Sequence, residues 1–140
     1  MSIELVPLCE VHLTLTDPIV IPSTPAGTRL IVPVTDGVVT GERLSGTIDS
    51  QAGGDWLTLD ATGIASIDVR VTIRTDDGAL VFVQYQGRGD MSGGPGAAPL
   101  YVAPRFEAGD ERYTWLNKVQ AVGKGILDGA DLTYELYEIR

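Results

Sequence analysis

Hydrophobic and polar residues alternate along most of this chain, and the spacing typical of helices is almost absent. The clearest alternation runs over residues 67–74, where every second residue is Ile or Val and the residues between them are polar. Side chains of a strand point alternately to its two faces, so this pattern predicts a strand with one buried face. The turn sequence Thr75-Asp76-Asp77-Gly78 and the apolar run 79–85 follow, and together they predict a β-hairpin.

The same criteria predict further strands, separated by turns that contain glycine or proline, near 9–16, 29–34, 38–48, 56–60, 118–126 and 131–139. One short helix is predicted near 110–117, where Asp110 can act as the N-cap. About eight or more short antiparallel strands indicate an all-β fold, either a sandwich or a barrel. We favour a single antiparallel closed β-barrel that spans residues 1–140 as one domain, because closure removes exposed strand edges.

The net charge of the chain limits the classes of partner that it can bind. Nineteen Asp and Glu residues against ten Lys and Arg give a net charge of −9, which opposes binding to nucleic acid and to anionic membrane surfaces. No apolar run approaches the roughly 20 residues that a membrane-spanning helix needs. Cys9 is the only cysteine, and the first residues lack the pattern of a signal peptide, so we expect a cytoplasmic protein without disulfides.

Motifs for cofactors and metals are missing from the sequence. One histidine and one cysteine leave little from which to build a zinc site, and no glycine-rich loop for a dinucleotide or a nucleotide phosphate is present. His12 falls on the polar face of a predicted strand, which makes Ser-His-Asp catalysis a poor interpretation. We therefore expect no cofactor and no metal.

The stretch Gly53-Gly54-Asp55-Trp56 is the most informative local feature. Glycine permits positive φ and close backbone approach, so the pair can fix an acid and an indole at one point on the rim of a sheet. One interpretation is a ligand pocket in which the acid lies beside an aromatic wall. The other is an ordinary strand entry, in which the tryptophan belongs to the core and the aspartate caps a turn.

Residues 87–99 are mostly glycine, proline and other small residues, and this composition predicts a mobile loop. The loop contains Arg-Gly-Asp at 88–90, which we interpret as coincidence in a chain expected inside the cell. A long loop in a compact domain can be a lid over a binding site or a plain connection, and both interpretations stay open.

Motifs in a fixed order extend over nearly the whole chain: Gly27-Thr28-Arg29, Pro33-Val34-Thr35, Gly37, Gly41, Gly46, Gly53-Gly54-Asp55-Trp56, Asp68-Val69-Arg70, Thr75-Asp76-Asp77-Gly78, Pro104-Arg105-Phe106-Glu107, Tyr113-Thr114-Trp115-Leu116-Asn117 and Tyr137-Glu138-Ile139-Arg140. In this set the chain resembles the bacterial and fungal family catalogued as domain of unknown function 3237, also called uncharacterised protein family 0311. The resemblance implies a small calycin-like β-barrel, a homo-oligomer, and no established general activity. The chain departs from the family pattern at Asp36, Val71 and Tyr85, where the family commonly has glycine, tyrosine and asparagine.

The candidate catalytic residues are Asp55, Glu107 and Arg70. Asp68 and Arg70 share one strand face, but the sequence leaves open whether that face points into the barrel or outward. An inward arginine would need a carboxylate partner, and the pair could stabilise a ligand oxyanion and move a proton. The candidate substrate-binding residues are Arg29, Trp56, Tyr85, Trp115 and Asn117. For Trp115 and Asn117 the alternative is structural, with the tryptophan closing the barrel end and the asparagine ending the helix.

Two classes of function remain after these exclusions. The first is a cofactor-independent isomerase, lyase or cyclase that acts by acid-base chemistry on a small cyclic or aromatic metabolite. The second is a non-catalytic carrier or sensor that uses the same pocket. A structural oligomer with a filled barrel is a third possibility, because barrels of about eight strands can be packed solid with side chains. We favour a small-molecule pocket, with a slight preference for catalysis.

Overall fold

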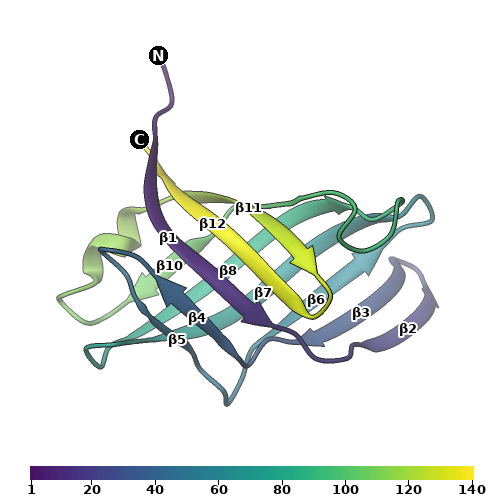
Figure 1. Cartoon of the computed structure of the whole chain (residues 1–140), viewed down its shortest axis with the longest axis horizontal. Coiled ribbons are helices and arrows are strands. Elements are labelled where there is room, and N and C mark those ends of the chain that lie inside the picture. Colours follow the sequence, from purple (N-terminus) through teal and green to yellow (C-terminus); the bar gives the residue numbers. More distant parts are fainter.

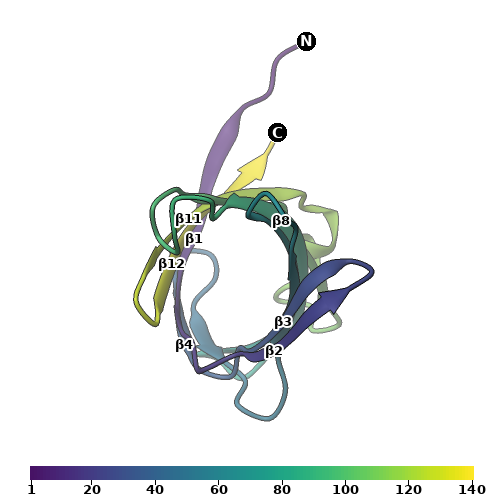
Figure 2. The same cartoon turned by 90° about the vertical axis from the view of Figure 1, so that its right-hand side faces the viewer.

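The computed structural model describes all 140 residues and is a closed antiparallel β-barrel, as predicted (Figure 1). Eight strands follow one another around the ring: β1 (Leu5–Thr14), β4 (Gly37–Thr40), β5 (Gly46–Ile48), β7 (Ile64–Thr75), β8 (Leu80–Asp90), β9 (Leu100–Val102), β11 (Ala121–Asp128) and β12 (Asp131–Ile139). The pairing of β7 with β8 completes the closure. The ring of strands is visible end-on in Figure 2.

Four more strands extend the sheet beyond the ring. β6 (Gly54–Leu59), β3 (Gly27–Pro33) and β2 (Ile19–Thr24) continue outward from β7, and β10 (Arg105–Ala108) pairs with β8. β10 and β2 are the two ends of the strand order, and the β2–β3 hairpin projects from the ring in Figure 2. The only helix is η1, a 3-10 helix over Thr114–Lys118. The chain has no helix whose length and hydropathy would suit a membrane crossing.

The sequence predicted the long hairpin and missed several short elements. The residues predicted as one strand at 38–48 form β4 and β5, which are separated by a loop. β2, β9 and β10 were not predicted, and β8 continues through Asp90 into the segment expected to be a loop. At 110–117 the structure has a turn followed by η1, so the predicted helix is shorter and tighter than expected.

The alternation of β7 settles which face points inward. Ile67, Val69, Val71 and Ile73 are buried in the core, so the residues between them, Asp68 and Arg70 included, lie on the outer face. Along its other edge β7 pairs with β6 over Ala65–Arg70 and with β5 over Ile73–Thr75. Near Val71 the strand beside β7 therefore changes from β6 to β5. This change of partner marks the boundary between the two ends of the barrel.

The end of the barrel built on β4, β5 and β10 is filled. Its interior, lined by residues such as Val39, Ile48, Ile73 and Phe106, leaves a void of only about 20 Å³. Leu116 of η1 is fully buried in the same hydrophobic core. Burial of this apolar surface is the main source of stability expected for such a core.

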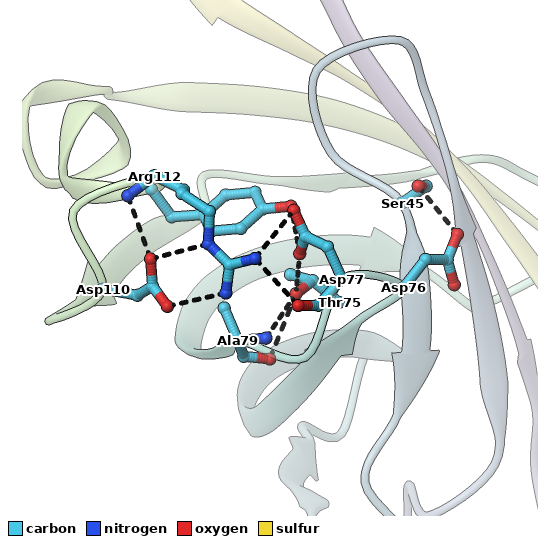
Figure 3. Close-up of polar contacts among 8 residues, drawn as sticks. Ser45, Thr75, Asp76, Asp77, Ala79, Asp110 and Arg112 are labelled. Atoms are coloured by element: carbon cyan, nitrogen blue, oxygen red, sulfur yellow. Dashed lines mark hydrogen bonds and ion pairs between the residues drawn. The ribbon is translucent and has the colours of Figure 1, made fainter.

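A polar network fastens η1 to the turn between β7 and β8 (Figure 3). The Asp77 carboxylate accepts hydrogen bonds from the Thr75 hydroxyl at 2.7 Å and the Tyr113 hydroxyl at 2.8 Å. Arg112 pairs with Asp110 through a 2.8 Å contact and donates to the Asp77 backbone carbonyl, also at 2.8 Å. Asp110 therefore supports the turn before η1. The β7–β8 turn holds η1 in place at the filled end of the barrel.

Several glycines lie inside strands, where they make room for large side chains. The sequence had suggested that most glycines lie in turns between strands. Gly125 on β11 pairs with Tyr134 on β12, and a Cβ atom at Gly125 would lie 2.6 Å from the Tyr134 ring atom Cδ1. Gly89 on β8 similarly faces Leu100, and an added Cβ would overlap that side chain. Tyr134 can occupy the barrel interior because its neighbour on β11 has no side chain.

We expect Gly125→Ala to lower the free energy of unfolding by about 1–3 kcal/mol, because the new methyl group must displace the Tyr134 ring. Urea unfolding measured by fluorescence tests this. The matched control is Gly109→Ala, since a Cβ there meets nothing within 4 Å. Equal stabilities for the two variants would contradict the packing role of Gly125.

Candidate functional site

The second end of the barrel is hollow. It holds a cavity of about 380 Å³ in which 15 of the 21 lining residues are hydrophobic. The volume falls in the range of roughly 300–1,000 Å³ that is common for small-molecule sites. The exposed residues Asp17, Pro18, Pro95, Gly129 and Ala130 also line it, so they form its mouth.

Two tyrosines separate the hollow end from the filled end. Tyr85 on β8 and Tyr134 on β12 line both the cavity and the packed interior next to it. Their rings meet edge to face, with centroids 5.7 Å apart and an interplanar angle of 73°. This geometry is favourable for aromatic pairs. The pair forms the floor of the cavity.

Asp55 brings the only carboxylate of the sheet into this cavity, and β6 directs it there. Residues alternate along β6, so Asp55 and Leu57 line the cavity while Trp56 points to the outer surface with 38% of its area exposed. The backbone of Gly53 approaches Val34 so closely that a side chain at 53 would overlap the Val34 carbonyl. The glycine pair therefore serves close backbone approach, and neither glycine has positive φ.

The β6–β7 ladder is interrupted beside Asp55. Asp55 pairs with Val69 and Thr58 with Ser66, while the two positions between them form no bridge. In this gap the Asp68 amide donates to Asp55 Oδ1 at 3.0 Å, and the Arg29 guanidinium donates to the Trp56 carbonyl at 2.6 Å. Side chains thus replace backbone partners that would otherwise be left unsatisfied.

Burial changes the acidity of the groups around the cavity. Desolvation raises the pKa of Asp55 from 3.8 to about 6, against the opposing effect of the Asp68 amide hydrogen bond. Desolvation also raises the pKa of Tyr85 and of Tyr134, and the nearby Asp55 charge adds to both shifts. Near neutral pH the interior of the cavity therefore holds the ionised Asp55 carboxylate beside two tyrosine hydroxyls that keep their protons.

Of the eight predicted site residues, the structure brings only Asp55 and Tyr85 together. Arg70 is exposed on the outer face of β7, because its position has the parity opposite to Val69 and Val71. Glu107 is exposed on β10, where it pairs with Phe82 on the far side of β8 from the cavity. Neither residue lines the cavity, so the face of Arg70 that the sequence left open is the outer one, and the pair with Asp55 or Glu107 that an inward arginine would have needed does not form.

The remaining predicted binding residues have structural partners. Arg29 is held at the Trp56 carbonyl in the ladder gap, on the outside of the barrel. Asn117 uses both ends of its amide on the backbone of Ala108, at 2.8 and 2.9 Å. Trp115 of η1 lies at the filled end, where the Arg43 guanidinium is 5.0 Å from the Trp115 ring centroid. Asp55 therefore faces tyrosine rings rather than the predicted indoles.

Sequence reasoning missed Tyr134 and the loop residues Met91 and Pro95, all of which line the cavity. The signal for Tyr134 was present, because it alternates with Leu132 and Leu136 on the inward face of β12. Nothing in a loop sequence indicates which strand end it covers. No cluster of three or more His, Cys, Asp or Glu side chains is arranged to hold a metal ion.

Replacing Asp55 by Asn should stabilise the protein near neutral pH. The folded-state pKa of about 6 lies above the ordinary 3.8, so the ionised carboxylate opposes folding. This cost is absent below 3.8, grows as the pH rises, and is complete above about 6, where it amounts to about 3 kcal/mol at most.

Urea unfolding of Asp55→Asn and wild type at about pH 5 and about pH 7.5 measures the effect, and the stability gain should be larger at the higher pH. Asp17→Asn, at the exposed mouth, is the control and should show no such increase. A gain that is the same at both pH values would contradict the buried ionised state of Asp55.

Curated relatives of the chain include bacterial and fungal proteins. A UPF0311 protein of Rhodopseudomonas palustris is 26% identical over 126 residues, which cover 81% of each chain. The hydroalkoxylation enzyme phnH of Penicillium herquei is 35% identical over 91 residues, which cover 64% of this chain and 52% of the enzyme.

Solved structures share the whole fold. A β-barrel-like protein of Acinetobacter baumannii superposes with a TM-score of 0.89 at 30% identity, covering 100% of this chain and 98% of the other. An enzyme from Penicillium herquei gives a TM-score of 0.72 at 26% identity, covering 99% and 94%. A family model described as a protein of unknown function (DUF3237) matches residues 3–139. With nearly its whole length matched, the chain belongs to the DUF3237 family.

Proposed function

We propose that this barrel is an enzyme that moves protons on a small, mainly apolar molecule bound in the cavity, with Asp55 as the base. One observation carries the proposal: a single carboxylate with a pKa of about 6 lies in an apolar cavity whose floor is made of two tyrosines. A general base works best when its pKa lies near the operating pH. Asp55 meets this condition because of its burial.

The carboxylate and the tyrosines have complementary roles. Their environment separates the acidities, since Asp55 is ionised near neutral pH while both tyrosines keep their protons. Such separation assigns the base to Asp55 and hydrogen-bond donation to Tyr85 and Tyr134. The two hydroxyls are also hydrogen-bonded to each other, and this pair at the floor can stabilise an oxygen on which negative charge develops. This replaces the arginine role expected from the sequence.

The reaction class that fits is the addition of a hydroxyl group across a C=C bond conjugated to a carbonyl. Asp55 takes the hydroxyl proton, the oxygen forms a C–O bond, and the π electrons move onto the carbonyl oxygen near the tyrosines. The carbon next to the carbonyl then takes the proton from Asp55. The product is an isomer of the substrate, so no oxidant or reductant is needed. A relative named as a hydroalkoxylation enzyme supports this class.

Turnover of 2′-hydroxychalcone tests the proposal, because this probe carries a phenol and a conjugated C=C bond in one molecule. We expect wild type to form flavanone with one enantiomer in excess and, in D2O, with deuterium next to the carbonyl. Asp55→Asn should lower kcat/KM by about 10²–10⁴-fold, the usual worth of a general base. Chiral chromatography with mass spectrometry measures both results.

Two further variants sharpen this experiment. Tyr85→Phe should lower kcat by about 10²-fold if its hydroxyl stabilises the developing charge. Glu107→Gln is the control and should leave turnover unchanged, because Glu107 is exposed on the outer surface. Racemic product at the buffer rate, with the probe bound and recovered unaltered, would overturn catalysis of this class and support a carrier.

The pH dependence gives an independent check. The base must be ionised, so kcat/KM should rise with pH, with a midpoint at about 6, and then level off. The raised pKa of Tyr85 and Tyr134 keeps the donors protonated across this range. Initial rates from about pH 5 to about pH 8 at constant ionic strength measure the profile. A rate that falls with rising pH would contradict Asp55 as the base.

A further inference from the structure

The cavity contains acids and no bases. None of its 21 lining residues is Lys, Arg or His, while Asp17 lies at the mouth and Asp55 inside. The whole chain carries a net charge of −9, so the background field is also negative. An anionic ligand would therefore meet only negative charge on its way into the cavity.

Nearby donors are committed elsewhere. The Asp68 amide already donates to Asp55, and the Arg29 guanidinium is bonded to the Trp56 carbonyl on the outer face. Arg70 points away from the cavity. The polar hydrogens at the floor belong to the hydroxyls of Tyr85 and Tyr134, which are neutral and are hydrogen-bonded to each other.

Like charges are costly at this position. Two like charges brought close together repel strongly where the effective dielectric constant is far below that of water. The ligand anion would also lose its hydration on entering an apolar chamber. A cation would lose hydration as well, but attraction to the Asp55 charge offsets that loss, and a neutral ring meets no charge repulsion.

We infer that the cavity selects uncharged or cationic ring compounds and excludes anions through the charge of Asp55. The inference rests on the proposed function in that it concerns the substrate of the same cavity. Molecules that carry a carboxylate, sulfate or phosphate, nucleotides and coenzyme A thioesters included, are rejected. The natural substrate accordingly presents phenol, alcohol or carbonyl groups as its polar atoms.

Three naphthalene probes of matched shape test this: 2-naphthol, 2-(aminomethyl)naphthalene and 2-naphthoate, which are neutral, cationic and anionic near neutral pH. Isothermal titration at about pH 7.5 should show that the naphthoate binds at least about tenfold more weakly than the naphthol. The amine should bind at least as tightly as the naphthol. Failure of the naphthol to bind, or equal affinity for the naphthoate, would overturn the inference.

The variants assign the selection to Asp55. In Asp55→Asn the ratio of the naphthoate to the naphthol dissociation constant should fall at least about threefold below the wild-type ratio, while Asp17→Asn should keep most of the discrimination. The discrimination in wild type should also weaken at about pH 5, where Asp55 becomes protonated. Burial, the Asp68 amide hydrogen bond and the Asp68 charge set the pKa of Asp55, and the titratable groups that face it are Asp68, Tyr85 and Tyr134.

A ratio of dissociation constants in Asp55→Asn that equals the wild-type ratio would overturn the role of this residue. The experiment needs no turnover, so it separates the two ideas. Discrimination without flavanone formation would leave the selectivity standing and remove only the proposed reaction.

Discussion

The closure of this barrel depends on one constraint: β7 and β8 are longer than the strands that flank them, so each must find two partners along its outer edge. β7 takes β6 and then β5, and β8 takes β9 and then β10. Backbone amides and carbonyls in a buried sheet need partners throughout. The change of partner is therefore obligatory, and it produces the boundary between the filled end and the hollow end.

The site lies where that arrangement is least regular. The ladder between β6 and β7 opens for two positions, and Asp55 and Arg29 supply hydrogen bonds from opposite faces of the sheet. Asp55 gains a fixed orientation from the Asp68 amide while its charge remains poorly solvated. The proposed role of Asp55 as a base and its cost to stability thus have the same origin, as is usual for groups whose pKa is tuned by burial.

Much of the fold was readable from the sequence because strand periodicity is a local signal. The alternation at 67–74 predicted β7, and the acidic turn that follows predicted the hairpin with β8. The site was harder to predict, because it depends on which alternate residues of each strand face the barrel interior. Asp55 was a candidate from its glycine context, but Arg70 and Trp56 lie one strand position away from inward-facing residues. Short strands such as β9 and β10 depend on long-range pairing that no local pattern reports.

The two ends of the barrel also differ in how well they tolerate substitutions. At the filled end a side chain such as Ile73 touches neighbours on all sides, so truncation leaves a void that the structure must tolerate. At the hollow end Leu30, Leu57 and Leu127 already face empty space on one side, and changing them forfeits fewer contacts. Substitutions during evolution can therefore change the shape of the cavity while the filled end keeps the protein folded. A change in ligand preference then costs little stability.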